Sequence, residues 1–227
     1  MISLSPRLQM VADLVRGKQP LADIGTDHAY LPAYLLLTGK IPSAIAADLR
    51  KGPLQNAEET VKKYGLYDKV TLVLSDGFQN LASFDCKEFV LAGMGGNLMA
   101  DLLSAAPWLQ NPDIHLVLQP QSHQEDLREY LYQNGFTILK EQLCREGTHL
   151  YLAMEAEYTG AVTDASPLSC YLGTLADSED PLKKEYFSRV LDRLDKRREG
   201  LLSCADTAEE CDFLSTLMIA IKERTGL

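Results

Sequence analysis

Short apolar runs alternate with longer amphipathic segments along the first two thirds of the chain. Five of these runs are almost entirely apolar, which is typical of parallel strands that helices cover on both faces. They span residues 21–24, 44–47, 70–74, 89–92 and 114–118. The segments between them, near residues 29–37, 53–64, 96–105 and 124–133, are long enough for crossover helices. The alternation predicts a doubly wound α/β fold with a mostly parallel sheet.

Two further features extend this pattern at its ends. Apolar residues recur at helical spacing over residues 5–15, and Ser5 before Pro6 has the form of an N-cap followed by a first-turn proline. A leading helix is therefore predicted. After the fifth strand, the runs 136–139 and 149–154 are joined by a loop around Gly147. Their spacing predicts an antiparallel hairpin at the end of the sheet.

The alternation stops near residues 157–164, and the rest of the chain has helical patterning. We therefore predict two domains, residues 1–160 and 161–227. Ser166 and Asp180, each before a proline, predict two helix starts, and Thr207 with Glu210 has the spacing of a capping box at a third. The last two helices carry apolar stripes that predict an antiparallel helical hairpin. The stripes consist of Phe187, Val190, Leu191 and Leu194, and of Phe213, Leu214, Leu217, Met218 and Ile221.

A chain of 227 residues with 46% apolar composition can bury a full core. The first residues show no basic stretch followed by an apolar block, and no segment approaches the roughly 18 unbroken apolar residues of a membrane span. We therefore expect a cytoplasmic protein. The five cysteines are odd in number and include no Cys-x-x-Cys pair, which favours free thiols over a disulfide framework or a zinc site. They are Cys86, Cys144, Cys170, Cys204 and Cys211.

The net charge of −10 argues against a nonspecific polyanion binder, which needs a concentrated basic surface. A local basic segment nevertheless lies between Lys183 and Arg198, where seven basic residues accompany three acidic ones. This segment is either a solvated helix face with local ion pairs or a phosphate-binding surface. The sequence leaves both interpretations open.

The most informative segment lies where the first predicted strand ends and its helix begins. It reads Asp23-Ile24-Gly25-Thr26-Asp27-His28-Ala29-Tyr30-Leu31-Pro32. A nicotinamide enzyme would carry Gly-x-Gly-x-x-Gly here, so that backbone amides meet a pyrophosphate. Instead Asp27 occupies the second glycine position and Asp23 ends the strand. Two carboxylates repel a diphosphate but suit a cationic ligand such as S-adenosylmethionine, which carries an ammonium and a sulfonium.

Acidic residues also follow the next two strands. Asp48 ends the second strand 23 residues after Gly25, where a carboxylate can accept both ribose hydroxyls of an adenosine. Asp76 follows the third strand and could accept from the adenine amine, with Phe78 or Leu49 against the ring. Each aspartate alone is ordinary turn chemistry, but three of them at consecutive strand ends predict an adenosyl site.

The fourth strand is followed by Gly93-Met94-Gly95-Gly96. These glycines either let the backbone approach a ligand or form a plain loop-to-helix turn. Because ligands bind at the carboxyl edge of α/β sheets, we expect the segment to lie beside the ligand.

Several of these stretches form one set of motifs. They are residues 23–32, Ala-Gly-Met-Gly-Gly at 92–96 and Leu-Gln-Pro at 118–120, with further agreement at 4–11, 52–54 and 76–77. Together they resemble the bacterial tRNA (adenine-22-N1)-methyltransferase family over roughly residues 1–157, whereas the helical tail matches only in kind. One departure is Gln121, where the family pattern leads us to expect asparagine.

The resemblance implies a class I, Rossmann-like methyltransferase domain and a small C-terminal all-helical coiled-coil domain. It also implies methyl transfer from S-adenosylmethionine to N1 of the adenine at position 22 of certain tRNAs. tRNA is then the expected partner, and neither a metal nor a membrane is expected. We favour a monomer, although the sequence leaves the oligomeric state open.

Adenine N1 attacks with an in-plane lone pair, so positioning dominates and no obligatory nucleophile is expected. Asp27 and Gln119 are the candidate catalytic residues, because they could hold the base edge and accept a proton from the exocyclic amine of the cationic product. Asp27 could equally bind the cofactor or cap the first helix. His28 fits a packed or cofactor-loop histidine better than a base, and Tyr30 is either a base-stacking or a half-buried helix tyrosine.

On the cofactor side, we expect Asp23, Gly25, Thr26, His28, Asp48, Leu49, Asp76, Gly77, Gly93, Met94 and Gly95. On the tRNA side, we expect Arg7, Tyr30, Pro120, Arg189, Arg193, Arg197 and Arg198, with the arginines along phosphates. The alternatives are a Rossmann methyltransferase for a protein or a small molecule, and a noncatalytic RNA-binding protein on the same fold. The family motifs disfavour the first alternative, and the three strand-end aspartates disfavour the second.

Overall fold

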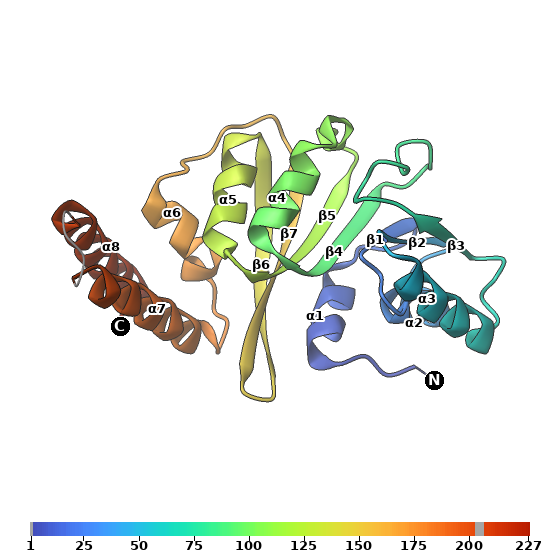
Figure 1. Ribbon diagram of the computed structural model, residues 1–227, viewed down its shortest axis with the longest axis horizontal. Coiled ribbons are helices and arrows are strands. Elements are labelled where there is room, and N and C mark those ends of the chain that lie inside the picture. Colours follow the sequence, from blue (N-terminus) through green and yellow to red (C-terminus); the bar gives the residue numbers. More distant parts are fainter. Residues whose placement is uncertain (1, 203–206) are drawn as a thin grey trace.

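The computed structural model describes residues 2–202 and 207–227, so Cys204 lies outside the described residues. Its centre is a seven-stranded sheet in the order β3-β2-β1-β4-β5-β7-β6 (Figure 1). The strands are β1 (Leu21–Ile24), β2 (Ala44–Asp48), β3 (Val70–Leu74), β4 (Glu88–Gly95), β5 (His115–Ser122), β6 (Phe136–Glu146) and β7 (His149–Tyr158). The helices are α1 (Pro6–Leu14), α2 (Tyr30–Leu37), α3 (Lys51–Tyr64), α4 (Gly96–Ser104), α5 (Gln124–Gln133), α6 (Pro167–Leu172), α7 (Lys183–Leu202) and α8 (Ala208–Thr225).

The first five strands are parallel, and β7 runs antiparallel to both β5 and β6. The predicted doubly wound sheet with a terminal antiparallel hairpin is therefore confirmed. The strands of the hairpin are longer than predicted. Beyond residue 139, β6 contains exposed as well as buried positions, so its outer part lacks the continuous apolar run of the covered strands.

Two hydrophobic clusters cover the two faces of the sheet. Alternate residues of a strand point to opposite faces, so Val90 packs with α1, α2 and α3, whereas Phe89 and Leu91 pack with α4, α5 and the C-terminal helices. Burial of both faces fixes the register of the strands, because a slip by one residue would exchange the two sets. The register in turn decides which strand ends meet at each edge of the sheet.

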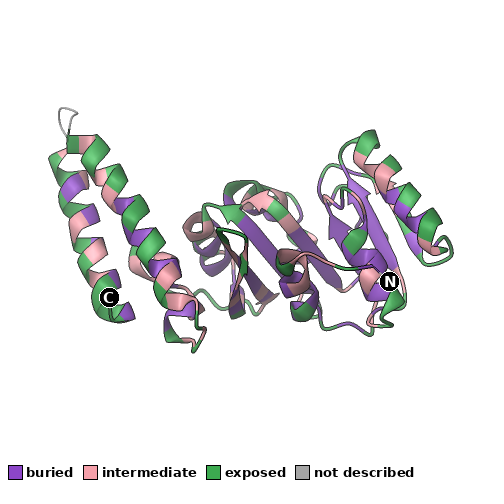
Figure 2. Ribbon diagram, turned by 90° about the horizontal axis from the view of Figure 1, so that it is seen from below, coloured by how far each residue is buried: buried purple, intermediate pink, exposed green. Residues whose placement is uncertain are grey.

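The C-terminal helices continue the cluster that contains α4 and α5. Leu194 of α7 and Leu214 and Leu217 of α8 belong to it, and Figure 2 shows α7 and α8 side by side at one end of the molecule. The predicted helical hairpin is confirmed, although Phe213 is exposed because it lies one residue off the buried stripe. The domain boundary at residue 160 stays a prediction, since one hydrophobic cluster runs across it.

A buried ion pair anchors this tail to the sheet. Arg128 of α5 donates from Nε to Glu141 of β6 (2.7 Å) and from Nη1 to the carbonyl of Cys170 in α6 (2.8 Å). The other Glu141 oxygen accepts from the backbone N–H of Leu175 (3.0 Å). Removing one partner of such a pair leaves an unpaired buried charge, which costs about 3–5 kcal/mol. The pair therefore ties α6 and the turn that follows it to the sheet.

The predicted capping residues have mixed outcomes. The hydroxyls of Ser5 and Ser166 accept backbone N–H groups of the first turns of α1 and α6, as predicted. Asp180 also accepts a backbone N–H two residues on, but the turn that it closes precedes α7. The predicted capping box is wrong, because the Thr207 hydroxyl donates to the carbonyl of Leu201 (2.7 Å) instead of accepting from α8.

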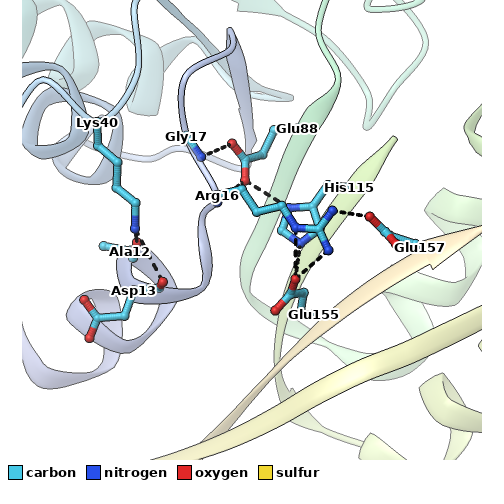
Figure 3. Close-up of polar contacts among 9 residues, drawn as sticks. All are labelled: Ala12, Asp13, Arg16, Gly17, Lys40, Glu88, His115, Glu155 and Glu157. Carbon is cyan, nitrogen blue, oxygen red and sulfur yellow. Dashed lines mark hydrogen bonds and ion pairs between the residues drawn. The ribbon is translucent and has the colours of Figure 1, made fainter. Parts of the chain in front are cut away.

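The amino edge of the sheet holds a polar cluster (Figure 3), which we call the amino-edge cluster. The Glu88 carboxylate accepts two backbone N–H groups of the loop after α1 (2.6 and 3.0 Å) and lies 2.9 Å from Nδ1 of His115. The other His115 nitrogen lies 3.0 Å from Glu155, and the Arg16 guanidinium binds both Glu155 and Glu157. Burial raises the pKa of Glu88, but these hydrogen bonds outweigh it and hold that pKa below its usual range. The cluster ties the loop after α1 to β4, β5 and β7.

Candidate functional site

A cavity of about 610 Å³ opens at the carboxyl edge of the sheet. This edge is where open α/β sheets bind ligands, and small-molecule sites typically measure about 300–1,000 Å³. Of the residues predicted for the cofactor, those that line the cavity are Asp23, Gly25, Thr26, His28, Asp48, Leu49, Asp76, Gly77, Gly93 and Met94. Of the other predicted site residues, Arg7, Asp27 and Tyr30 line it too.

The Asp23 carboxylate is buried where β1 approaches the cavity. Its Oδ2 accepts from the hydroxyl of Thr26 (2.6 Å). Burial raises the pKa of Asp23 to about 6, the Asp48 charge acts in the same direction, and the Thr26 hydrogen bond opposes them. A carboxylate with so high a pKa lacks compensation inside the protein, and a ligand cation beside it would favour the charged form.

Two more carboxylates at this edge have spare acceptor capacity. Oδ1 of Asp48 accepts from the backbone N–H of Arg50 (2.9 Å), and no hydrogen bond to its Oδ2 is found among the described residues. The Asp76 carboxylate forms neither a hydrogen bond nor an ion pair within the described part of the chain. Three carboxylates that the protein does not saturate therefore meet in one cavity.

The loop between β1 and α2 has an unusual backbone. Gly25 (φ +74°), Asp27 (φ +49°) and Ala29 (φ +52°) all adopt the left-handed region. The positive φ favours glycine at position 25, and a side chain there would also displace the terminal methyl group of Met94. Alanine pays roughly 1–2 kcal/mol for this conformation, and such strain is found where binding sites impose a geometry.

Exposed Asp27 and Tyr30 and half-buried His28 line the cavity on this loop and the first turn of α2. The Asp27 side chain is 63% exposed and lies 3.5 Å from Nε2 of His28. The His28 ring stacks on Tyr30, with 5.0 Å between the centroids and 5° between the planes. An exposed, flat pair of rings can receive a large aromatic ligand, which agrees with the base-stacking interpretation of Tyr30.

The two apolar candidates for an adenine ring are separated by the fold. Leu49 lines the cavity and is 61% exposed, whereas Phe78 is buried and packs edge-on against two other aromatic rings. Leu98 and Leu102 of α4 also line the cavity and were missed. An apolar residue on an amphipathic helix carries no sequence signal that separates a cavity wall from the core.

Apart from the tail arginines, three residues predicted for the site do not line the cavity. Gln119 and Pro120 are buried in β5, and the Gln119 side-chain oxygen accepts from Nη1 of Arg7 (2.8 Å). Gly95 stands at the N-cap of α4, where it supports the loop without reaching the cavity wall. Gln121, two residues further along the same strand, lines the cavity instead. The sequence pattern marked Gln121 only as a departure from the family.

The tail arginines do not line the cavity, and each has a partner. Arg193 binds Glu125 at the start of α5 (3.0 Å), and Arg197 binds a glutamate of α8 (2.6 Å). Arg189 and Arg198 are paired with acidic residues of α7 itself. The local ion pairs that we considered for this segment are therefore present. Exposed pairs of this kind contribute only about 0–1 kcal/mol, so a phosphate can replace the carboxylate.

The residues of the cavity fit S-adenosylmethionine. The under-compensated carboxylate of Asp23 suits its cationic end, the spare oxygens of Asp48 and Asp76 suit the ribose hydroxyls and the adenine amine, and Leu49 suits the ring. No cluster of three or more metal-ligating side chains occurs among the described residues. Within the same part of the chain, no helix is both long and apolar enough to cross a membrane.

The strand order, the antiparallel hairpin at its end and the acidic cavity define a class I methyltransferase. Residues 4–154 match a family model described as a methyltransferase domain, and the chain belongs to that family. More narrowly, it belongs to the tRNA (adenine(22)-N(1))-methyltransferases. The protein of that name from Bacillus subtilis (strain 168) is 31% identical over 221 residues, which cover 95% of this chain and 93% of that protein.

Solved structures agree over the whole length. The crystal structure of the Bacillus subtilis m1A22 tRNA methyltransferase has a TM-score of 0.88 at 29% identity, and the match covers 99% of this chain and 100% of that one. A Streptococcus pneumoniae protein in complex with S-adenosyl-L-methionine has a TM-score of 0.82 at 30% identity, with 98% and 100% covered. The predicted fold class and family are confirmed.

Proposed function

We propose that this chain transfers the methyl group of S-adenosylmethionine to N1 of the adenine at position 22 of tRNA. The observation that carries the proposal is the 31% identity to the Bacillus subtilis enzyme over 95% of this chain. The acidic cavity at the carboxyl edge supports it independently, because its three carboxylates suit a cationic adenosyl ligand.

S-adenosylmethionine supplies an electrophilic methyl group on a sulfonium. The chain has to hold the acceptor base in line with that methyl group, and N1 needs no prior loss of a proton because its lone pair lies in the plane of the ring. The methylated ring carries a positive charge. A cavity lined by carboxylates favours that charge as it develops.

We assign the Asp23 carboxylate to the methionine ammonium, Asp48 to the ribose hydroxyls and Asp76 to the adenine amine of the cofactor. Leu49, which is exposed into the cavity, covers the cofactor ring. The same carboxylates disfavour a nicotinamide dinucleotide, because they would repel its diphosphate.

We assign Asp27 to the acceptor base rather than to the cofactor. Its side chain is 63% exposed on the cavity rim, next to the stacked rings of His28 and Tyr30. Asp27→Asn should lower kcat by about 10- to 100-fold and leave the Kd of the cofactor unchanged. Asp76→Asn is the matched variant, because it should weaken the cofactor and leave kcat intact at saturation. If Asp27→Asn weakened the cofactor instead, the assignment to the base would fail.

We assign the tail arginines to tRNA phosphates. Arg193 and Arg197 are 48% and 58% exposed, and a guanidinium has five donors, so a surface ion pair leaves capacity for phosphate. The buried pair of Arg128 and Glu141 ties α6 to the sheet, and α8 packs against α6. The tail can therefore set the distance between a bound RNA backbone and the methylated base.

The function is tested by methyl transfer from labelled S-adenosylmethionine to two transcripts of one tRNA, which differ only in having adenine or guanine at position 22. Nucleoside analysis should find 1-methyladenosine in the first transcript and no label in the second. Equal labelling of both transcripts would show that position 22 is not the methylated position. Labelling of neither, with the cofactor bound, would reject tRNA as the acceptor and leave the fold assignment standing.

A further inference from the structure

Arg7 reaches from the first turn of α1 into the interior of the molecule. Its side chain lines the cavity, and Nη1 donates to the side-chain oxygen of Gln119 at 2.8 Å. Gln119 is completely buried in β5, so its side-chain oxygen takes its hydrogen bonds from protein donors. A hydrogen bond to a buried amide oxygen is costlier to lose than one at the exposed surface, which makes this contact consequential.

Gln119 in turn holds an irregular point of β4. The pairing of β4 with β5 shifts between Ala92 and Met94, and Gly93 lies at that irregularity with φ +84°. The Gly93 N–H donates to the same Gln119 oxygen at 3.1 Å. Because a bulged residue leaves the regular ladder, its N–H needs another acceptor, and Gln119 supplies it.

The two hydrogen bonds also remove Gln119 from direct chemistry. Its oxygen has two lone pairs, and it accepts from both Arg7 and Gly93. Its nitrogen donates to the carbonyl of Pro120 at 3.2 Å. Gln119 therefore acts on the cavity only through Gly93 and Arg7, both of which line it.

A third segment meets at the same place. The backbone N–H of Arg7 donates to Glu146 at the end of β6 (3.0 Å), and the guanidinium lies 5.7 Å from the centroid of the Tyr151 ring in β7. Helix α1, the irregular part of β4 and the β6–β7 hairpin thus converge on Arg7. A guanidinium that touched the acceptor base directly would oppose the charge that the base gains on methylation.

We propose that Arg7 is a positioning residue for methyl transfer: through buried Gln119 it holds the Gly93 bulge, and with it the wall of the cavity, in the reactive arrangement. The proposal rests on the proposed methyltransferase function. It replaces both the phosphate contact expected of Arg7 and the direct catalytic contact expected of Gln119. The latch, as we call Arg7, Gln119 and Gly93, connects the N-terminal helix to the reacting centre.

Kinetics separate the latch from a phosphate contact. Arg7→Ala should lower kcat by about 10- to 100-fold and leave the Kd of tRNA and its salt dependence unchanged, because small displacements of reacting groups are costly. Arg7→Lys keeps the positive charge but loses the planar guanidinium group, so its kcat should also be lower than that of the wild type. Gln9→Ala is the control on the same helix, since Gln9 binds only Asp13 at the surface and should retain full activity.

A double variant tests whether the two side chains act as one unit. Gln119→Ala should resemble Arg7→Ala, and the combined variant should lose little more than either alone. If the fold-loss of kcat in the double variant equalled the product of the two single losses, the residues would act independently and the latch would be overturned. An unchanged kcat in Arg7→Ala, or a weaker tRNA Kd with a salt slope reduced by about one, would also overturn it in favour of a phosphate contact.

A measurement without tRNA keeps the proposal apart from the proposed function. Hydrogen exchange of the Gly93 amide should be at least tenfold faster in Arg7→Ala than in the wild type, and unchanged in Gln9→Ala. An unchanged rate in Arg7→Ala would reject the latch even if the wild type methylates tRNA. Absence of 1-methyladenosine with the wild type would reject the proposed function, whatever the exchange rate.

Discussion

At the amino edge of the sheet, Glu88 and His115 are buried. The Glu88 carboxylate accepts hydrogen bonds from two backbone N–H groups and lies within hydrogen-bond distance of a ring nitrogen of His115. At the carboxyl edge, Asp23 is also buried, but the hydrogen bond that its carboxylate accepts comes from the hydroxyl of Thr26. The pKa of Glu88 is held below its usual range in spite of burial, whereas burial raises the pKa of Asp23 to about 6. The same sheet thus saturates its charges at one edge and leaves them under-compensated at the other.

This difference separates structural charges from ligand-binding charges. A buried carboxylate that hydrogen bonds fully compensate stabilises the fold and has little left to offer a ligand. A buried carboxylate without such compensation costs stability until a cation arrives. The sequence contains both kinds of residue as isolated acidic positions, and only the partners tell them apart.

The largest effect is expected at the amino edge. Glu88→Ala removes the acceptor for the loop after α1 and leaves His115 without one of its carboxylates, so the free energy of unfolding should fall by about 3–5 kcal/mol. The Kd of S-adenosylmethionine should stay unchanged below the unfolding transition. Urea unfolding and calorimetric titration measure the two quantities, and a loss under about 1 kcal/mol would contradict the structural role.

Asp23→Asn should show the reverse pattern. It removes the negative charge that we assign to the cofactor ammonium, so the affinity for S-adenosylmethionine should fall about 100-fold, or roughly 2.7 kcal/mol. The free energy of unfolding without cofactor should stay equal or increase, because a costly buried charge is removed. An unchanged affinity for S-adenosylmethionine, or a clear fall in the free energy of unfolding, would contradict the assignment of Asp23 to ligand binding rather than to the fold.

The two edges should also respond oppositely to pH. The raised pKa of Asp23 contributes stability that is present below its ordinary value of 3.8 and is lost as pH rises through about 6. The lowered pKa of Glu88 contributes stability that is present above its ordinary value of 4.5 and is lost as pH falls through its folded value. Wild type, Asp23→Asn and Glu88→Gln compared by urea unfolding from about pH 3 to pH 7 should show these opposite slopes, with the Glu88 change below 4.5 and the Asp23 change between 3.8 and about 6.

Cofactor binding sharpens the same contrast. The charged form of Asp23 binds the ammonium, so the affinity for S-adenosylmethionine should fall about tenfold from pH 7 to pH 5 in the wild type. Asp23→Asn should show a much flatter profile. If both proteins gave the same pH profile in titration calorimetry, another group would have to control binding.

The smallest effect is expected at the exposed pairs of the tail. Arg193→Ala should weaken tRNA binding two- to fivefold and reduce the salt slope by about one, without a change in cofactor affinity. Glu125→Ala frees the Arg193 guanidinium from its pair, so it should leave tRNA binding equal or stronger. Filter binding at several salt concentrations distinguishes these outcomes, and weaker binding in Glu125→Ala would contradict the phosphate role.

The sheet could be predicted because its strands are covered on both faces. Residues 21–24 and 70–74 have the bounds of β1 and β3, and parallel strands place Asp23, Asp48 and Asp76 at one edge without further information. Residues 140–146 of β6 were missed, because this part of the strand has no continuous apolar run.

The roles of polar residues in β5 could not be predicted in the same way. Gln119 and Gln121 are two residues apart in one strand, and only the tertiary structure decides that the first is buried and the second lines the cavity. Similarly, Arg193 forms an ion pair with Glu125, which lies 68 residues earlier in the sequence. Such partners depend on tertiary packing, which no local pattern records.

The most direct test of the site is a crystal structure with S-adenosylhomocysteine. We expect the ligand in the carboxyl-edge cavity, with its ammonium on Asp23, its ribose hydroxyls on Asp48 and its adenine amine within hydrogen-bond distance of Asp76. The amino-edge cluster should be unchanged. A ligand bound elsewhere, or in this cavity without contact to the three carboxylates, would contradict the account.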